Sequence, residues 1–255
     1  RDVLLDEMNS DLMEEYEAYL KGHGVSLNTV SFYNRILRAA YNRAVEKGLT
    51  PQRHPFRNVY TGMEKTVKRA IPFEAVRKIK ELDLSLKPAL DFARDMFLFS
   101  FYTRGMSFVD MAYLKKSDLK NGMLSYRRKK TGQQLHIRWE RCMQEIVEKH
   151  PNTTTEYLLP VITDPAGSDR KQYENALHLV NRKLKKVAEM AGLSVTLTMY
   201  VARHAWASTA KCKNIPLSVI SEGMGHDSET TTQIYLASLD TSVIDEANKL
   251  ILKDL

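Results

Sequence analysis

The chain has 255 residues, of which 43% are hydrophobic and 27% charged, and a formal net charge of +7. This is the composition of a globular protein with a sizeable core, and no apolar run reaches the roughly 20 residues that a membrane-spanning helix needs. Two cysteines, Cys142 and Cys212, are too few for a disulfide framework, and no apolar signal-peptide core follows Arg1. We therefore expect a cytoplasmic protein with no membrane partner.

The positive charge is concentrated in one part of the chain. Residues 18–70 hold ten Lys or Arg and only two acids, whereas the first seventeen residues are acidic. A basic patch of this kind favours a polyanionic partner, and nucleic acid is the first candidate.

Two helices are predicted in the first fifty residues. Ser10 is a candidate N-cap for a helix over residues 11–21, and Ser26 or Asn28 starts a longer helix that ends near Lys47.

The second of these helices carries basic residues between its apolar positions. Arg35, Arg38 and Asn42 fall outside the 3.6-residue apolar period. Three such residues alone indicate a solvated helix face, but the positive excess of the whole segment favours contact with a phosphate backbone. We predict DNA contacts from Arg35 and Arg38.

A change of composition divides the chain after the second helix. Residues 49–70 contain Pro51, Pro55 and Gly62 with weak periodicity, which is typical of a linker. We predict a helical domain over 1–68 and a larger domain over 69–255.

The larger domain begins with predicted helices. Pro72 opens a helix whose apolar face includes Val76 and Ile79, and residues 91–102 are apolar nearly all round, as in a buried helix. A short helix that ends near Leu114 follows.

One stretch predicts β structure. Residues 123–128 and 134–139 alternate in polarity around a turn at Lys130, Thr131 and Gly132. The tip of this hairpin is basic, so it could enter a DNA groove, although an exposed hairpin that is kept soluble by its charges would look the same. We predict DNA contacts from Arg128 and Lys129.

The rest of the chain is predicted to be helical. The predicted segments are residues 140–149, 171–191, 203–211, 216–224, 228–237 and 243–252.

An arginine, a histidine and a tyrosine in these last helices suit chemistry on a phosphodiester. Arg203 offers a planar fork for two phosphate oxygens, His226 follows a Gly-x-Gly stop, and Tyr235 lies nine residues further on, past a helix cap at Ser228. The neighbouring His204 faces elsewhere on its helix and is expected to be a buried structural residue.

Together with Lys130-Thr131-Gly132, this ordered pattern resembles the tyrosine recombinases, the phage-integrase family of site-specific DNA recombinases. It looks most like the integrases and DNA invertases of mobile elements, whose signature reads like residues 105–110, Gly-Met-Ser-Phe-Val-Asp. The likeness covers nearly the whole chain. It implies a mainly α fold with a small β-hairpin or sheet, in which a SAM-like helical core-binding domain precedes an α+β catalytic domain.

The resemblance also implies roles for individual residues. Tyr235 would attack the scissile phosphate and form a 3′-phosphotyrosyl bond, and Arg203 would stabilise the charge that develops on the phosphate oxygens. Lys130 would protonate the departing 5′-oxygen, and His226 would orient the phosphate. The family mechanism needs no metal and no other cofactor.

The partner implied by the family is double-stranded DNA with specific recombination sites, clamped between the two domains. Four protomers would assemble on two such sites, and a monomer in solution is compatible with this scheme. The sequence leaves open the target site, the choice among integration, excision and inversion, the need for accessory proteins, and whether an arm-binding domain precedes Arg1.

The sequence departs from the family pattern at two positions. Ser107 stands where the family usually has an arginine, so Arg104 or Arg128 must supply the missing cation, and of the two we favour Arg104. Tyr200 stands where a histidine is usual; its hydroxyl can hydrogen-bond a phosphate or the nucleophile, but a phenol is a poorer base at neutral pH.

Two other functions fit parts of the pattern. A DNA-binding regulator could have kept the fold and lost catalysis through Ser107 and Tyr200. A type IB topoisomerase shares the chemistry but would act without a particular site, and the compact layout of the chain argues against it.

Overall fold

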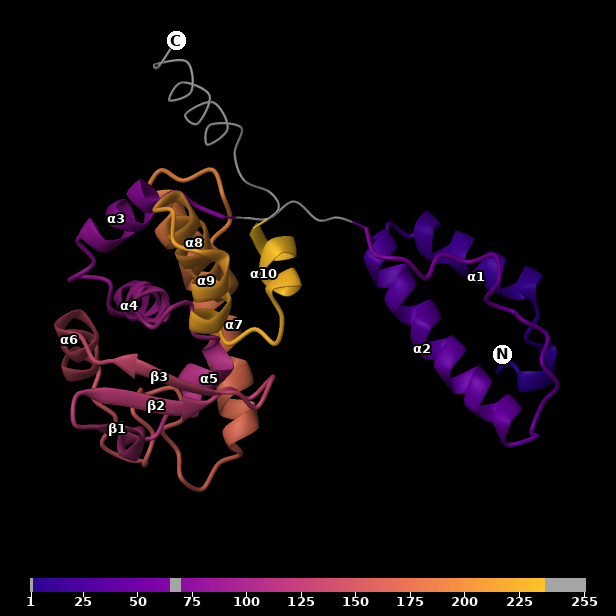
Figure 1. Cartoon of the computed structure of the whole chain (residues 1–255), viewed down its shortest axis with the longest axis horizontal. Helices are drawn as coiled ribbons and strands as arrows, with labels where there is room; N and C mark the ends of the chain where they lie inside the picture. The colour runs from indigo at the N-terminus through magenta and orange to yellow at the C-terminus, as the bar shows by residue number, and fades with distance from the viewer. Residues whose placement is uncertain (1, 65–69, 237–255) are drawn as a thin grey trace, which may run out of the picture. The chain divides into compact units, whose positions relative to one another are not determined.

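The computed structural model describes residues 2–64 and 70–236, and for residues 234 and 235 it describes the backbone alone (Figure 1). The chain divides into two compact units, Arg1–Val67 and Lys68–Leu255. The predicted C-terminal helix over 243–252 lies outside the described residues. No helix within the described ranges has both the length and the apolar character of a membrane span.

The N-terminal unit consists of a 3₁₀ turn, two α-helices and an extended segment. The elements are η1 (Leu5–Glu7), α1 (Ser10–Gly22) and α2 (Leu27–Glu46). Ser26 caps α2, as one of the two alternatives predicted, but Asn9 and not Ser10 caps α1. The Oδ1 of Asn9 accepts a hydrogen bond from the backbone N–H of Leu12 at 2.9 Å. Asn9 has the extended backbone of an N-cap, whereas Ser10 is already the first residue of the helix.

A buried carboxylate joins the two helices of this unit to the extended segment. Glu17 accepts hydrogen bonds from the backbone N–H of Tyr60 at 2.6 Å and from the Nδ2 of Asn34 at 3.1 Å, and it pairs with Lys21. Burial alone would raise the pKa of Glu17, but these donors and the Lys21 ammonium lower it. The apolar core beside it is small: Met13, Tyr41, Phe56 and Val59.

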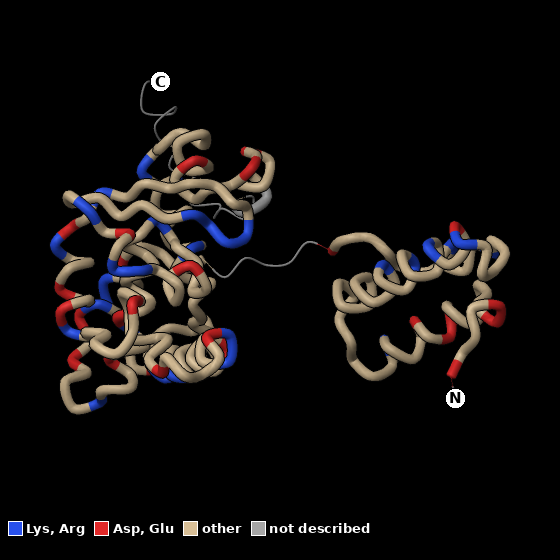
Figure 2. Tube along the Cα trace, turned by 90° about the horizontal axis from the view of Figure 1, so that it is seen from below, with Lys and Arg blue, Asp and Glu red and all other residues tan. Residues whose placement is uncertain are grey.

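Charge is unevenly distributed over the N-terminal unit. Figure 2 shows acids gathered on α1 and bases on α2. Arg35 and Arg38 are both exposed on α2. The NH1 group of Arg38 donates to the Oγ1 of Thr61 at 3.3 Å, which holds this guanidinium beside the extended segment.

The C-terminal unit packs helices around the buried helix α4. The helices are α3 (Phe73–Glu81), α4 (Pro88–Tyr102), α5 (Phe108–Ala112), η2 (Lys116–Asp118), α6 (Arg141–Lys149), α7 (Asp169–Met190), α8 (Met199–Cys212), α9 (Leu217–Met224) and α10 (Glu229–Leu236). Helix α4 packs against α6, α7 and α8, and its residues Met96, Phe97 and Phe99 are fully buried. The predicted mainly helical fold is confirmed.

A small antiparallel sheet completes this unit. Its strands are β1 (Leu119–Lys120), β2 (Met123–Arg127) and β3 (Gln134–Arg138), in the order β1-β2-β3. The hairpin is confirmed, with Tyr126 opposite Leu135, but β1 was not predicted because two residues are too short for a periodic pattern.

Helix α8 begins four residues earlier than predicted. The N-cap residue Thr198 makes no side-chain hydrogen bond to the first turn of α8. Instead the backbone N–H of Met199 donates to the Oδ1 of Asn181 on the neighbouring helix α7 at 2.9 Å. As a result Tyr200 and Arg203 lie on the same helix.

Candidate active site

Arg203 is the best-anchored polar residue of the site. Its side chain is buried, and its guanidinium donates to the carbonyl oxygens of Gly105 at 2.7 Å and Met224 at 2.6 Å. Gly105 has a left-handed φ of +73°, and a Cβ at this position would lie 2.7 Å from the Cα of Arg203. Only glycine permits this close approach of the two backbones.

His226 lies directly against this guanidinium. It follows Gly225, the left-handed C-cap of α9, and its Nε2 is 3.0 Å from the NH2 of Arg203. Because arginine can only donate, Nε2 accepts, and the ring proton is assigned to Nδ1, which donates to the Oγ1 of Thr232 at 2.7 Å.

The imidazole of His226 is neutral at pH 7. Burial, together with the positive charges of Arg203, Arg128 and Lys130, lowers its pKa from 6.5 to about 4. A nearby anion would offset the charges of these cations and make the ring more basic.

The turn between β2 and β3 contributes a second buried arginine. Arg128 is 7% exposed, and its NH1 donates to the carbonyl oxygen of Gly225, which the Oγ1 of Thr131 also approaches at 3.5 Å. Among the described residues, the buried Nε of Arg128 has no hydrogen-bond acceptor. A buried N–H of a cation without an acceptor is costly unless a ligand supplies one.

These side chains line one pocket of about 600 Å³. The predicted catalytic and DNA-binding residues that line it are Arg128, Lys130, Tyr200, Arg203 and His226. Three of them are basic, and Asp227 is the acid that lines the same pocket, so the pocket is suited to an anion.

Arg104 is not among the residues that line this pocket. It has a left-handed φ of +61°, and its Cδ lies 3.7 Å from the position that a Cβ on Gly223 would occupy. The side chain therefore extends toward α9. Of the two candidates for the missing cation, the structure places Arg128 in the pocket.

Ser107 lines the pocket, but its hydroxyl serves α5. The Oγ caps the helix and lies 2.6 Å from the Oδ2 of Asp110. The Ser-x-x-Asp spacing is a helix-capping signal that sequence reasoning missed.

The remaining predicted residues lie on α8 and α10. Tyr200 is 60% exposed, and its ring packs edge-on against that of His204, with centroids 4.5 Å apart. His204 is 3% exposed, which confirms it as buried. The backbone of Tyr235 is in α10, whose first turn is capped by the Oγ of Ser228, and its side chain lies outside the described part of the structure.

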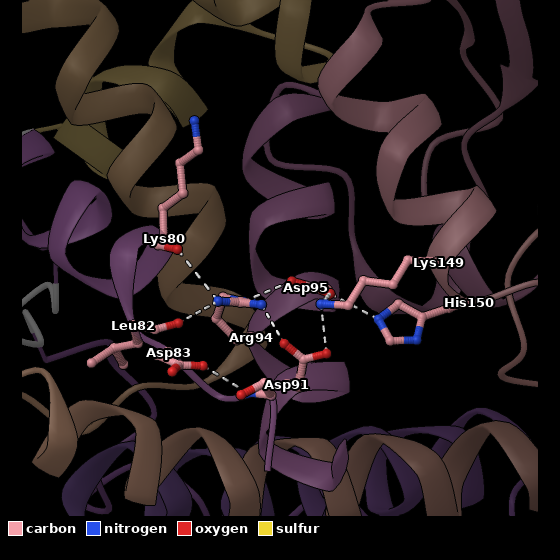
Figure 3. Close-up of polar contacts among 9 residues, drawn as sticks. Lys80, Leu82, Asp83, Asp91, Arg94, Asp95, Lys149 and His150 are labelled. Atoms are coloured by element: carbon pink, nitrogen blue, oxygen red, sulfur yellow. Dashed lines mark hydrogen bonds and ion pairs between the residues drawn. The ribbon is translucent and has the colours of Figure 1, made fainter. Parts of the chain in front are cut away.

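A second polar cluster joins α4 to the end of α6 (Figure 3). Asp91, Asp95 and His150 bring ligand-type atoms within 4.8 Å of one another, a grouping that sequence reasoning missed although the two acids are four residues apart on one helix. The Nε of Arg94 and the Nζ of Lys149 lie 2.7 and 2.8 Å from the carboxylate of Asp95. Two cations already neutralise the two acids, so this donor set does not favour a metal ion.

The comparisons with known proteins agree with this geometry. The model of the phage integrase SAM-like domain matches residues 1–61, and that of the phage integrase family matches residues 86–242. Tyrosine recombinase XerA of Thermococcus onnurineus is 25% identical in an alignment of 273 positions, gaps included, that covers 90% of this chain and 91% of the relative. XerA of Pyrococcus furiosus is 26% identical over 86% of this chain and 72% of its own length.

Solved structures share the fold. A lambda integrase dimer bound to a COC′ core site has a TM-score of 0.70 at 16% identity, covering 92% of this chain and 82% of that one. A lambda integrase tetramer bound to a Holliday junction reaches 0.72 at 16% identity, over 94% of this chain and 68% of that one. The XerH recombinase in a post-cleavage complex with its difH substrate reaches 0.70 at 17% identity, over 94% and 71%.

Proposed function

The chain belongs to the phage integrase family of tyrosine recombinases, and on that premise we propose which of its residues cut and rejoin DNA. It is a site-specific recombinase. The observation that supports the assignment of residues is the single pocket lined by Arg203, Arg128, Lys130 and His226.

We propose that Tyr235 is the nucleophile. Its phenolic oxygen bonds to the scissile phosphorus while the bond from phosphorus to the 5′-oxygen breaks, and Lys130 donates a proton to that oxygen. The phenol proton passes to the Nε2 of His226, which becomes available when the guanidinium of Arg203 turns to the phosphate. The phosphodiester energy is kept in the phosphotyrosine, so the reverse step can rejoin strands.

Arg128 replaces the usual first arginine in this proposal. It is buried, lines the pocket and has an Nε without an acceptor among the described residues, whereas Arg104 points toward α9. With Arg203 it would stabilise the charge on the nonbridging oxygens of the transition state. Tyr200 would hydrogen-bond the phosphate or the nucleophile from the rim of the pocket.

The proposed partner is double-stranded DNA. The exposed Arg35 and Arg38 of α2 would contact its backbone, and Arg128 would contact the scissile phosphate. Since lambda integrase relatives are described as a dimer on a core site and a tetramer on a Holliday junction, we propose a tetramer on DNA for this chain as well. We propose that the reaction takes place in the cytoplasm, where the protein would meet its DNA substrate.

A nicked suicide substrate tests the proposal. After cleavage the short 5′-hydroxyl fragment diffuses away, so a covalent protein–DNA adduct accumulates. Wild type should form the adduct and Tyr235→Phe should not. Arg128→Ala should reduce adduct formation by roughly a hundredfold, while Ser107→Ala and Arg104→Ala stay within a few fold of wild type.

The same experiment separates the alternative function. Stable, sequence-dependent DNA binding by wild type without any adduct would identify a DNA-binding regulator. A greater loss in Arg104→Ala than in Arg128→Ala would move the missing cation to Arg104.

A further inference from the structure

Lys129 lies between the two catalytic candidates Arg128 and Lys130, but its side chain leaves the turn on the other side. Arg128 and Lys130 line the active-site pocket, whereas Lys129 lines a separate depression with Asp110 and Tyr113. The residue predicted from sequence as a DNA contact is therefore engaged within the protein.

Two contacts seat Lys129 against the end of α5. Its ammonium Nζ is 3.0 Å from the centroid of the Tyr113 ring, and its backbone N–H donates to the Oδ1 of Asp110 at 2.9 Å. A cation over the face of an aromatic ring is attracted by the ring quadrupole. One contact holds the backbone of the turn, and the other holds the side chain.

Tyr113 and Asp110, which contact Lys129, are themselves held in place by neighbouring residues. The Tyr113 ring packs edge-on against Tyr157, with centroids 5.8 Å apart, and lies 6.3 Å from Tyr173 on α7. Asp110 is 4% exposed and bonded to the hydroxyl of Ser107. The ring is therefore held by contacts that do not involve the turn.

We propose that Tyr113 is a positioning residue for the general acid: by holding the Lys129 ammonium on its ring, it fixes the β2–β3 turn so that Lys130 meets the departing 5′-oxygen. The inference rests on the proposed role of Lys130 as the acid. An acid must stay within hydrogen-bond reach of the oxygen that it protonates, and Lys130 is exposed on a turn. A misplacement of about 1 Å can slow a reaction a hundredfold.

The ring, and not the hydroxyl, carries this role. Tyr113→Phe keeps the aromatic face and should cleave like wild type, whereas Tyr113→Leu should form adduct roughly ten- to a hundredfold more slowly. Lys129→Met should share the defect, and Lys129→Arg, which keeps a cation for the ring, should largely restore the rate. The double variant Lys129→Met, Tyr113→Leu should be no slower than either single variant, since both substitutions remove the same contact between the ammonium and the ring.

A modified substrate shows whether the defect lies in acid catalysis. Sulfur in place of the bridging 5′-oxygen of the scissile phosphate makes the leaving group a thiolate, which departs without a proton. On this substrate Tyr113→Leu, Lys129→Met and the reference variant Lys130→Ala should all cleave within a few fold of wild type. Affinity for uncleaved DNA, measured at two salt concentrations, should be unchanged in Tyr113→Leu.

Three results would overturn the proposal. One is wild-type cleavage of ordinary DNA by both Tyr113→Leu and Lys129→Met. A second is an equal defect of these variants on the oxygen and sulfur substrates, which would indicate general damage. If Tyr113→Leu does not fold, the comparison of Lys129→Met with Lys129→Arg tests the proposal by itself, because the side chain of Lys129 is exposed.

The third result concerns the premise. If wild type forms no Tyr235-dependent adduct, or if sulfur does not rescue Lys130→Ala, the proposed function or the proposed acid fails first, and the role of Tyr113 falls with it. Rescue of Lys130→Ala without rescue of Tyr113→Leu would refute the positioning role alone.

Discussion

The C-terminal unit contains two buried clusters of charged side chains that differ in how their charge is balanced. In the cluster of Figure 3, Asp91 and Asp95 face Arg94 and Lys149, and His150 lies 2.8 Å from Asp95. Burial would raise the pKa of Asp95, but the hydrogen bonds from His150 and Lys149 lower it. Each buried acid is paired with a cation, and we call a cluster whose charges balance in this way closed.

The active-site cluster is built from the opposite arrangement. The described partners of Arg203 and Arg128 are carbonyl oxygens and one imidazole, and the pKa of His226 is lowered to about 4 partly because of their charge. Backbone carbonyls orient a guanidinium without neutralising it. In a closed cluster the loss of one partner leaves a buried charge without a counter-charge and destabilises the fold, whereas an open cluster of cations suits an anion.

The largest expected effect is on stability, in the closed cluster. Arg94→Met leaves two buried carboxylates to a single lysine and should lower the free energy of unfolding by about 3–5 kcal/mol. Urea unfolding can be followed by the two tryptophans, Trp139 and Trp206, which both lie in the C-terminal unit. Per folded molecule, adduct formation should be unchanged.

Arg141→Met is the matched control. Arg141 forms an i,i+4 ion pair with Glu145, but its side chain is 92% exposed. The substitution should change the free energy of unfolding by less than about 0.5 kcal/mol. Equal losses in Arg94→Met and Arg141→Met would contradict the idea of a closed, buried cluster.

The next effect is on catalysis, in the open cluster. Arg203→Lys keeps the charge but loses the planar fork, so adduct formation should fall by roughly 10²–10³-fold, and the free energy of unfolding should fall by less than in Arg94→Met. Single-turnover cleavage of the suicide substrate measures it, with Arg182→Lys, on the exposed face of α7, as the control. A loss of stability larger than that of Arg94→Met would mean that the two clusters do not differ as described.

The smallest effect is the pH dependence of stability. Because the folded-state pKa of His226 lies near 4 and the ordinary value is 6.5, the unfolded chain binds more protons between these pH values. The free energy of unfolding should therefore fall as the pH is lowered from about 6.5 to 4, and His226→Gln should lose less over that window. The carboxylate of Asp95 contributes only at lower pH, since its ordinary pKa is 3.8 and its folded-state pKa is lower. Identical slopes for wild type and His226→Gln between pH 7 and 5 would refute a depressed pKa.

The features of the C-terminal unit that depend on local patterns could be predicted from the sequence. Period-2 alternation predicted the hairpin, and the apolar run of residues 91–102 predicted the buried helix. The pocket residues Arg203, His226 and Lys130 were singled out by their order along the chain. The polar contacts between segments far apart in the chain could not be predicted, since no local sequence pattern indicates that Arg128 donates to the carbonyl oxygen of Gly225.

The choice between two arginines illustrates the limit. Arg104 precedes α5 by one turn, which made it the nearer substitute in sequence, whereas in the structure its side chain extends toward α9 and Arg128 lines the pocket. Likewise His150 has no motif around it, and only the packing of α6 on α4 brings it to Asp95. Charge balance within a cluster is a property of the tertiary structure.

The most direct test of the account is to map the residue that carries DNA in the trapped adduct. Trypsin releases residues 214–249 as a peptide with a single tyrosine, Tyr235, and residues 187–203 as another with a single tyrosine, Tyr200. After nuclease digestion, mass spectrometry should find a nucleotide on the 214–249 peptide and no adduct in Tyr235→Phe. A nucleotide on the 187–203 peptide, or an adduct that persists in Tyr235→Phe, would contradict the account.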